Sequence, residues 1–133
     1  MTHALAFRLD GASGVPVYRQ LIDQVLVAIA SGTLEPGDQL PTVRQLAVDL
    51  SINPNTVMRA YKELEIRGIL TTQQGTGTFI TRQEVRLDEA QRDKRLTQLV
   101  GDFVARAGAD GYTVEELRQR LAELASDGGK KRN

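Results

Sequence analysis

Cysteine is absent from this sequence, and His3 is its only histidine. Without cysteine the chain can form neither a disulfide nor a thiolate metal site, as is usual for proteins of the cytoplasm. One histidine leaves metal catalysis and general-base chemistry almost no residues to work with, and no nucleophile–base pair or carboxylate dyad can be assembled. We therefore expect a cytoplasmic protein that is not an enzyme and has no cofactor or metal site.

Long apolar runs and aromatic residues are also scarce. No run approaches the roughly 18 apolar residues that suggest a membrane span, and the start MTHALAFRLD lacks the basic and apolar regions of a secretory signal. Aromatic residues make up 5% of the chain, too few for a platform that stacks single-stranded nucleic acid. The sequence predicts no membrane partner. Its 133 residues, 41% of them hydrophobic, are enough for one domain with a small appendage.

Neither half of the chain carries a net charge. Residues 1–82 contain seven Lys/Arg and seven Asp/Glu, and residues 83–133 contain ten of each. The pI of about 6.6 lacks the basic signature of an electrostatic DNA-binding protein. Any affinity for DNA must therefore come from a local arrangement of charges. The neutral balance favours an alternative, a protein-interaction module that makes no DNA contact.

Apolar spacing and capping residues predict three helices in the first half of the chain. An amphipathic stripe marks a first helix between about residues 16 and 32. Thr42 can cap a second helix over about 43–50. Asn53 followed by Pro54 is a favoured opening for a third helix, which runs to about residue 67. A short polar turn between the second and third helices is typical of a helix-turn-helix.

The third helix is expected to point polar side chains outward near its start, where a DNA groove would be read. Asn55 and Thr56 suit contacts with base edges or phosphates, although simple N-terminal capping is the alternative. Arg59 can reach a guanine edge or a phosphate, or it can pair with Glu63 four residues later. Arg44 in the second helix can reach a phosphate or remain a solvated surface arginine.

Two β-prone segments follow, over residues 69–72 and 78–81. The tip between them contains Gln74, Gly75, Thr76 and Gly77, and its glycines permit positive φ and a close approach of the backbone to another surface. A phosphate-binding loop is excluded because no Gly-Lys-Ser/Thr ending and no helix follow. The tip is either a plain hairpin or a wing whose backbone N–H groups bond DNA phosphates.

Two more helical stripes follow a densely charged segment that begins near Gln83. Thr113 and Glu116 can form a capping box that opens the last helix. The two stripes present more apolar surface than a two-helix hairpin can hide, so we expect them to form a homodimer interface. The residues of this interface would be Leu96, Leu99, Val100, Phe103, Val104, Leu117, Leu121 and Leu124. The final residues, 128–133, look disordered.

The run LEPGDQLPTVRQLAVDLSINPNTVMRAYKELEIRGIL, followed by QGTGTFI, resembles the DNA-binding domain of the GntR family of bacterial transcriptional regulators. The upstream PVYRQLIDQVLVAIASG is similar to that family's first helix, and the short tail resembles the YtrA-like branch. The resemblance covers about residues 15–82 closely, and the tail only by length and helical pattern.

That resemblance implies where DNA would be contacted. The implied positions are Arg44 in the second helix, Asn53, Pro54, Asn55, Thr56 and Met58 or Arg59 in the third, and Gln74 and Gly75 in the wing. Many relatives carry arginine where Pro54 and Met58 stand, so Arg44 and Arg59 should matter more in this chain.

These observations lead to one expected architecture. It is mainly α with a small β-hairpin wing: a winged helix-turn-helix over 10–82, a two-helix C-terminal dimerisation tail over 83–127, and a disordered end. The expected function is sequence-specific binding of double-stranded DNA by a homodimeric transcriptional regulator, a repressor acting on an inverted-repeat operator. The sequence does not specify a small-molecule effector.

Overall fold

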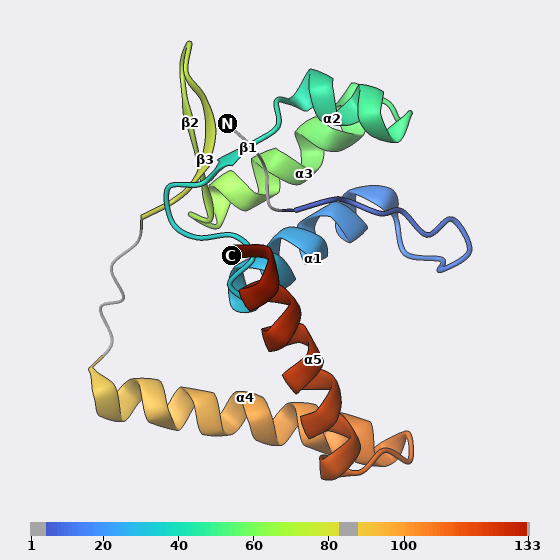
Figure 1. The fold of residues 1–133 in the computed structure, drawn as a ribbon, viewed down its shortest axis with the longest axis vertical. Helices are drawn as coiled ribbons and strands as arrows, with labels where there is room; N and C mark the ends of the chain where they lie inside the picture. Colours follow the sequence, from blue (N-terminus) through green and yellow to red (C-terminus); the bar gives the residue numbers. More distant parts are fainter. Residues whose placement is uncertain (1–4, 83–87, 133) are drawn as a thin grey trace. The chain divides into compact units, whose positions relative to one another are not determined.

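A computed structural model describes residues 5–82 and 88–132. The chain forms two compact units: an N-terminal unit up to residue 83, with which the residues from Asp127 onward are grouped, and a second unit over residues 84–126. Figure 1 shows the helices and strands of both. The N-terminal unit is a mostly helical winged helix-turn-helix, as the sequence predicts. No helix within the described ranges is long and apolar enough to cross a bilayer.

Three helices form the helical part of the N-terminal unit: α1 (Val17–Ala30), α2 (Val43–Leu50) and α3 (Pro54–Ile66). The predicted caps are confirmed. The Thr42 hydroxyl accepts a hydrogen bond of 3.0 Å from the Gln45 N–H, and the Asn53 side-chain oxygen accepts one of 2.8 Å from the Asn55 N–H. Each bond satisfies a backbone donor that has no partner within its helix. The cap residues therefore fix where α2 and α3 begin.

The turn between α2 and α3 depends on Ser51, which adopts the left-handed conformation at φ +57°. The Ile52 N–H that follows donates to the Ala47 carbonyl at 3.0 Å. Ala47 is buried, and Ile52 packs half-buried against the core. A small residue on α2 and an apolar residue in the turn thus let the two helices cross closely.

The sheet has three antiparallel strands in the order β1-β3-β2: β1 (Gln39–Leu40), β2 (Leu70–Gln73) and β3 (Gly77–Ile80). The sequence predicted only the hairpin of β2 and β3, with an extended link ending at Leu40. That link is instead a strand, since Gln39 faces Phe79 and Leu40 faces Thr78 on β3. The wing is therefore paired along the strand that leads into the helix-turn-helix.

The core of the N-terminal unit joins all three helices and all three strands. Its largest fully buried side chains include Leu21 and Ile22 of α1, Leu40 of β1 and Leu64 of α3. Burial of such apolar area is the main stabilising contribution to a fold of this kind. The helices and the wing are thus held as one body.

An N-terminal arm packs on this core ahead of the expected boundary at residue 10. Leu5, Phe7 and Leu9 are half-buried against the core. Gln24 binds both backbone groups of Arg8: its Oε1 accepts from the Arg8 N–H at 3.0 Å, and its Nε2 donates to the Arg8 carbonyl at 2.6 Å. The folded unit therefore begins at least as early as residue 5.

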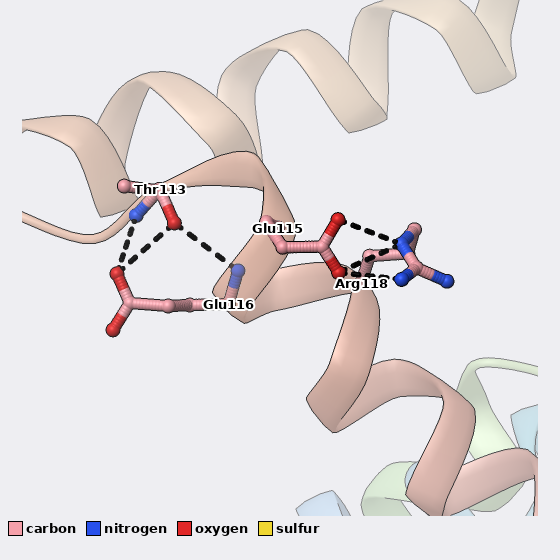
Figure 2. A network of polar contacts seen from close by, with 4 residues as sticks. All are labelled: Thr113, Glu115, Glu116 and Arg118. Atoms are coloured by element: carbon pink, nitrogen blue, oxygen red, sulfur yellow. Dashed lines mark hydrogen bonds and ion pairs between the residues drawn. The ribbon is translucent and has the colours of Figure 1, made fainter.

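The second unit contains α4 (Glu89–Ala109) and the part of α5 (Val114–Arg132) up to Ser126. Figure 2 shows the predicted capping box at the start of α5, in which the Glu116 N–H donates to the Thr113 hydroxyl at 3.2 Å and the Glu116 carboxylate accepts from the Thr113 N–H at 3.0 Å. Beside it, Arg118 forms an ion pair with Glu115.

The end of the chain differs from the expectation of disorder over 128–133, because α5 continues to Arg132. Once a helix is nucleated at a strong cap, each further residue adds one hydrogen bond, so the helix can extend through Gly128 and Gly129. The start of the expected charged linker, over residues 83–87, lies outside the described residues.

Candidate nucleic-acid interface

The first two turns of α3 present a polar, solvent-exposed face. Burial of Val57, Ala60, Tyr61 and Leu64 fixes the rotation of the helix about its axis. The residues left exposed by that rotation are Asn53, Pro54, Asn55, Met58, Arg59 and Lys62, while Thr56 is half-buried. The residues expected to contact DNA from α3 therefore share one accessible stretch at its N-terminal end.

Asn53, rather than Asn55 or Thr56, caps the start of α3. Its side-chain oxygen holds the Asn55 N–H, and its carbonyl holds the Thr56 N–H at 2.9 Å. The side chains of Asn55 and Thr56 make no hydrogen bond among the described residues. Their amide and hydroxyl groups are thus available to a ligand, and the amide nitrogen of Asn53 keeps two donors of its own.

The cations on or next to the three helices differ in whether a carboxylate compensates them. Arg19 lies 3.6 Å from Asp23 and Arg67 lies 3.2 Å from Glu63, each four residues apart on its helix. Arg44 and Lys62, both exposed, have no ion pair or hydrogen bond within the part of the chain that the structure describes. The two helices are formally neutral, since Asp49, Glu63 and Glu65 balance Arg44, Arg59 and Lys62, but Arg44 and Lys62 are exposed cations that no carboxylate holds among the described residues.

Arg59 also has no ion pair among the described residues, but its guanidinium contacts an aromatic ring, and its alternative pairing with Glu63 is wrong. The Glu63 carboxylate is held by Arg67, and the Arg59 guanidinium lies over the ring of Tyr18 on α1, 3.7 Å from the centroid. A glutamate that precedes its cationic partner by four residues is the better oriented pair on a helix, because the helix dipole favours that order. Arg59 therefore has no ion pair among the residues that the structure describes.

The wing tip is exposed at Gln74, Gly75 and Thr76 and half-buried at Gly77. Gly75 has φ +78° and nothing within 4 Å of where a Cβ would lie, so its backbone is open to an approaching surface. The Thr76 N–H closes the turn by donating to the Gln73 carbonyl at 3.0 Å. The tip can therefore present unobstructed backbone to a phosphate.

Two side-chain contacts hold the wing to its neighbours. Gln39 of β1 donates from Nε2 to the Thr76 carbonyl at 3.2 Å. Thr72 of β2 donates its hydroxyl to the Glu65 carboxylate on α3. Sequence reasoning assigned no role to Gln39 or to Tyr18. No local sequence pattern could identify the contact of Gln39 with Thr76 or that of Tyr18 with Arg59, because the two residues of each pair lie far apart in sequence.

The expected dimer residues lie in the second unit, apart from the expected DNA contacts in sequence. Six of the eight are exposed apolar side chains: Leu96, Leu99, Val100, Phe103, Leu121 and Leu124. The other two, Val104 and Leu117, are half-buried. Of the residues described in α4 and α5, only Ala107 is buried. The two helices therefore leave their apolar stripes largely uncovered.

The fold and the exposed face of α3 define the class of protein, a winged helix-turn-helix protein. Residues 17–80 match the family described as bacterial regulatory proteins, gntR family. The chain is also 39% identical over 130 residues to the HTH-type transcriptional repressor YtrA of Bacillus subtilis, covering 93% of this chain and 97% of that protein. This chain belongs to the GntR family.

Solved structures agree with the assignment. A GntR family transcriptional regulator from Listeria monocytogenes matches with a TM-score of 0.59 and 33% identity, over 86% of this chain and 98% of its own. The DNA-binding domain of AraR, solved in complex with an operator, matches with a TM-score of 0.50 and 26% identity, over 60% of this chain and 100% of its own. GntR family members are DNA-binding transcription factors, and this chain is a transcriptional regulator rather than an enzyme.

Proposed function

We propose that this regulator is a repressor that binds an inverted-repeat operator as a homodimer. The start of α3 would read base edges, Arg44 would contact a phosphate, and the wing tip from Gln74 to Gly77 would lie on the DNA backbone. The repressor role is supported by the name of the YtrA protein, which the chain matches along nearly its whole length. Location in the cytoplasm, where its DNA would lie, is part of the same proposal.

The observation that carries the proposal is the distribution of charge. Arg19 and Arg67 are compensated by neighbouring carboxylates, whereas Arg44, Arg59 and Lys62 form no ion pair among the described residues. Phosphate contacts by cations supply most of the affinity for DNA, and each one releases counterions. A neutral chain can therefore bind DNA if its unpaired cations lie on α2 and α3.

The uncovered stripes of α4 and α5 support the homodimer. Fully burying one large apolar side chain is worth about 1.5–3 kcal/mol. Leu99 is 55% exposed and Phe103 is 45% exposed, so a monomer forgoes much of that free energy. A second copy offers the same stripe and can cover it by twofold symmetry.

The proposal is tested by selecting bound duplexes from a random pool and measuring affinity for the selected site against salt concentration. We expect an inverted repeat. Arg44→Ala should weaken binding to all duplexes and reduce the slope of log affinity against log salt by about one, since one phosphate contact is lost. Asn55→Ala should instead change base preference, at about 1–3 kcal/mol if the amide makes a bidentate base contact.

Arg19→Ala is the matched control, because it removes one positive charge on α1 that Asp23 already compensates, and it leaves the Arg67–Glu63 pair intact. It should leave both the slope and the base preference close to those of the parent. A parent protein that enriches no duplex would overturn the proposal and favour the protein-interaction module. Equal effects of Arg44→Ala and Arg19→Ala would show that the assigned face is wrong.

A further inference from the structure

We propose that Tyr18 is a positioning residue of the DNA-binding surface, which holds the Arg59 guanidinium ready for a bidentate acceptor. The inference rests on the proposed function of α3. The observation behind it is a contact between α1 and α3: the guanidinium carbon of Arg59 lies over the Tyr18 ring, 3.7 Å from the ring centroid.

The Tyr18 ring is a fixed platform. It lies in the first turn of α1, is half-buried, and packs against the core formed with α3. The adjacent buried residues Leu21 and Ile22 lock the helix that carries it. An arginine on its face is attracted by the ring electrons, and the distance is well inside the roughly 6 Å over which that attraction acts.

The stacked guanidinium is still free to bind. A guanidinium on a ring face uses its flat surface and keeps its five N–H donors around its edge. No hydrogen bond or carboxylate partner of Arg59 occurs within the described ranges, because Glu63 is taken by Arg67. The acceptor that fits such an edge is planar or bidentate, either the O6/N7 edge of a guanine or two oxygens of a phosphate.

Preorganisation is what the ring adds. A long arginine side chain normally loses conformational freedom when it binds, and this loss weakens affinity. Contact with Tyr18 limits that freedom before DNA arrives. Removal of the ring should therefore weaken binding only through Arg59.

A double-mutant cycle on the full chain tests this, with the duplex selected by the parent as the probe. Tyr18→Leu should weaken binding about two- to tenfold, the range expected for the immobilisation of one side chain. Tyr18→Phe, which retains the ring, should bind as the parent does. In an Arg59→Ala background, Tyr18→Leu should cause no further loss.

Thermal unfolding of each variant separates positioning from folding. If the Tyr18–Arg59 contact only stabilises the fold, Arg59→Ala and Tyr18→Leu should lower the melting temperature alike and leave the affinity for the duplex unchanged. That result would overturn the inference. So would an equal loss from Tyr18→Leu with and without Arg59. If the parent selects no duplex, the proposed function fails first; if the parent binds but the coupling is absent, only the role of Tyr18 fails.

The salt dependence of Arg59→Ala identifies the acceptor. A slope reduced by about one with unchanged base preference indicates a phosphate. An unchanged slope with relaxed preference at a guanine indicates the base edge. Either result supports an Arg59 contact, and neither change appearing would overturn it.

Discussion

Tyr61 links α3 to the entry of α2 through its hydroxyl group. Its side chain is 4% exposed, and its hydroxyl donates a 2.7 Å hydrogen bond to the Pro41 carbonyl, which is buried too. Burial raises the pKa of Tyr61 well above its usual value of about 10, because the phenolate would lose its hydration. The residue is therefore a neutral hydrogen-bond donor in the folded protein at ordinary pH.

Tyr61→Phe should lower the free energy of unfolding by about 1–3 kcal/mol, since the Pro41 carbonyl would lose its donor inside the core. Denaturant unfolding at neutral pH measures this. Tyr112→Phe is the matched control, because Tyr112 is exposed, and its effect should stay within about 0.5 kcal/mol. Equal stability of the two variants would contradict the role given to the bond.

The raised pKa of Tyr61 also predicts how the stability of the fold depends on pH above about 10. Because the folded pKa is raised, the Tyr61 contribution is fully present below the unfolded pKa of about 10 and declines as the pH rises above it. The stability difference between the parent and Tyr61→Phe should therefore shrink above about pH 10. A difference that stays constant to higher pH would be inconsistent with that pKa.

Single residues also mark where sequence reasoning is weak. The exposed side of α3 follows from its helical period, and it is confirmed. The partner of Arg59 cannot be predicted in this way. Arg59 and Arg67 each lie four residues from Glu63 and compete for it, and the residue that Arg59 contacts, Tyr18, lies on another helix. Ser51 at φ +57° is equally hidden, since serine has no marked preference for the left-handed conformation.

At the scale of the element, the two glycines of the wing tip are required for different reasons. Gly75 needs positive φ but faces open space. Gly77 has φ +135°, outside the region that side chains tolerate, and a Cβ there would lie 2.5 Å from the Gln39 amide nitrogen. That amide holds the Thr76 carbonyl, so the tip and β1 are coupled at this point.

Gly77→Ala should lower the free energy of unfolding of the N-terminal unit by about 1–3 kcal/mol, through backbone strain and displacement of Gln39. It should also weaken duplex binding, because the tip would lose its fixed position. Gly75→Asn is the matched control, since asparagine tolerates the left-handed region, and it should leave stability within about 0.5 kcal/mol. Thermal unfolding and duplex titration of both variants measure these effects, and the reverse ranking would refute the account.

Elements with a local signal could be predicted, and those built from distant contacts could not. The caps of α2, α3 and α5 follow from Thr42, Asn53 and Thr113, each of which bonds a backbone N–H two or three residues later. β1 has two residues, too few to show a period, and only its pairing with β3 defines it. The N-terminal arm depends on Gln24, 16 residues beyond Arg8.

At the scale of the whole molecule, the proposed homodimer would depend on the stripe of α4. Leu99→Asp combined with Phe103→Asp should convert a dimer into a monomer at micromolar concentration, because two carboxylates would lose their hydration in the interface. Light scattering on the full chain measures this. Ile66→Asp is the matched control, since Ile66 is 74% exposed in the N-terminal unit, and it should leave the dimer intact. A monomeric parent would refute the dimer outright.

The dimer in turn predicts the geometry of the DNA site. Two copies related by a twofold axis present two α3 helices to half-sites about one helical turn apart, or a multiple of it.

Insertion of five base pairs at the centre of the selected operator rotates one half-site by about half a turn of the double helix, so that both copies can no longer bind together. We expect this insertion to weaken binding of the parent strongly, whereas insertion of ten base pairs should restore part of it if the tail can stretch. The Leu99→Asp/Phe103→Asp variant should bind the original and the five-base-pair duplexes with equal, weak affinity. If that variant discriminates between the two duplexes as the parent does, the tail does not set the spacing.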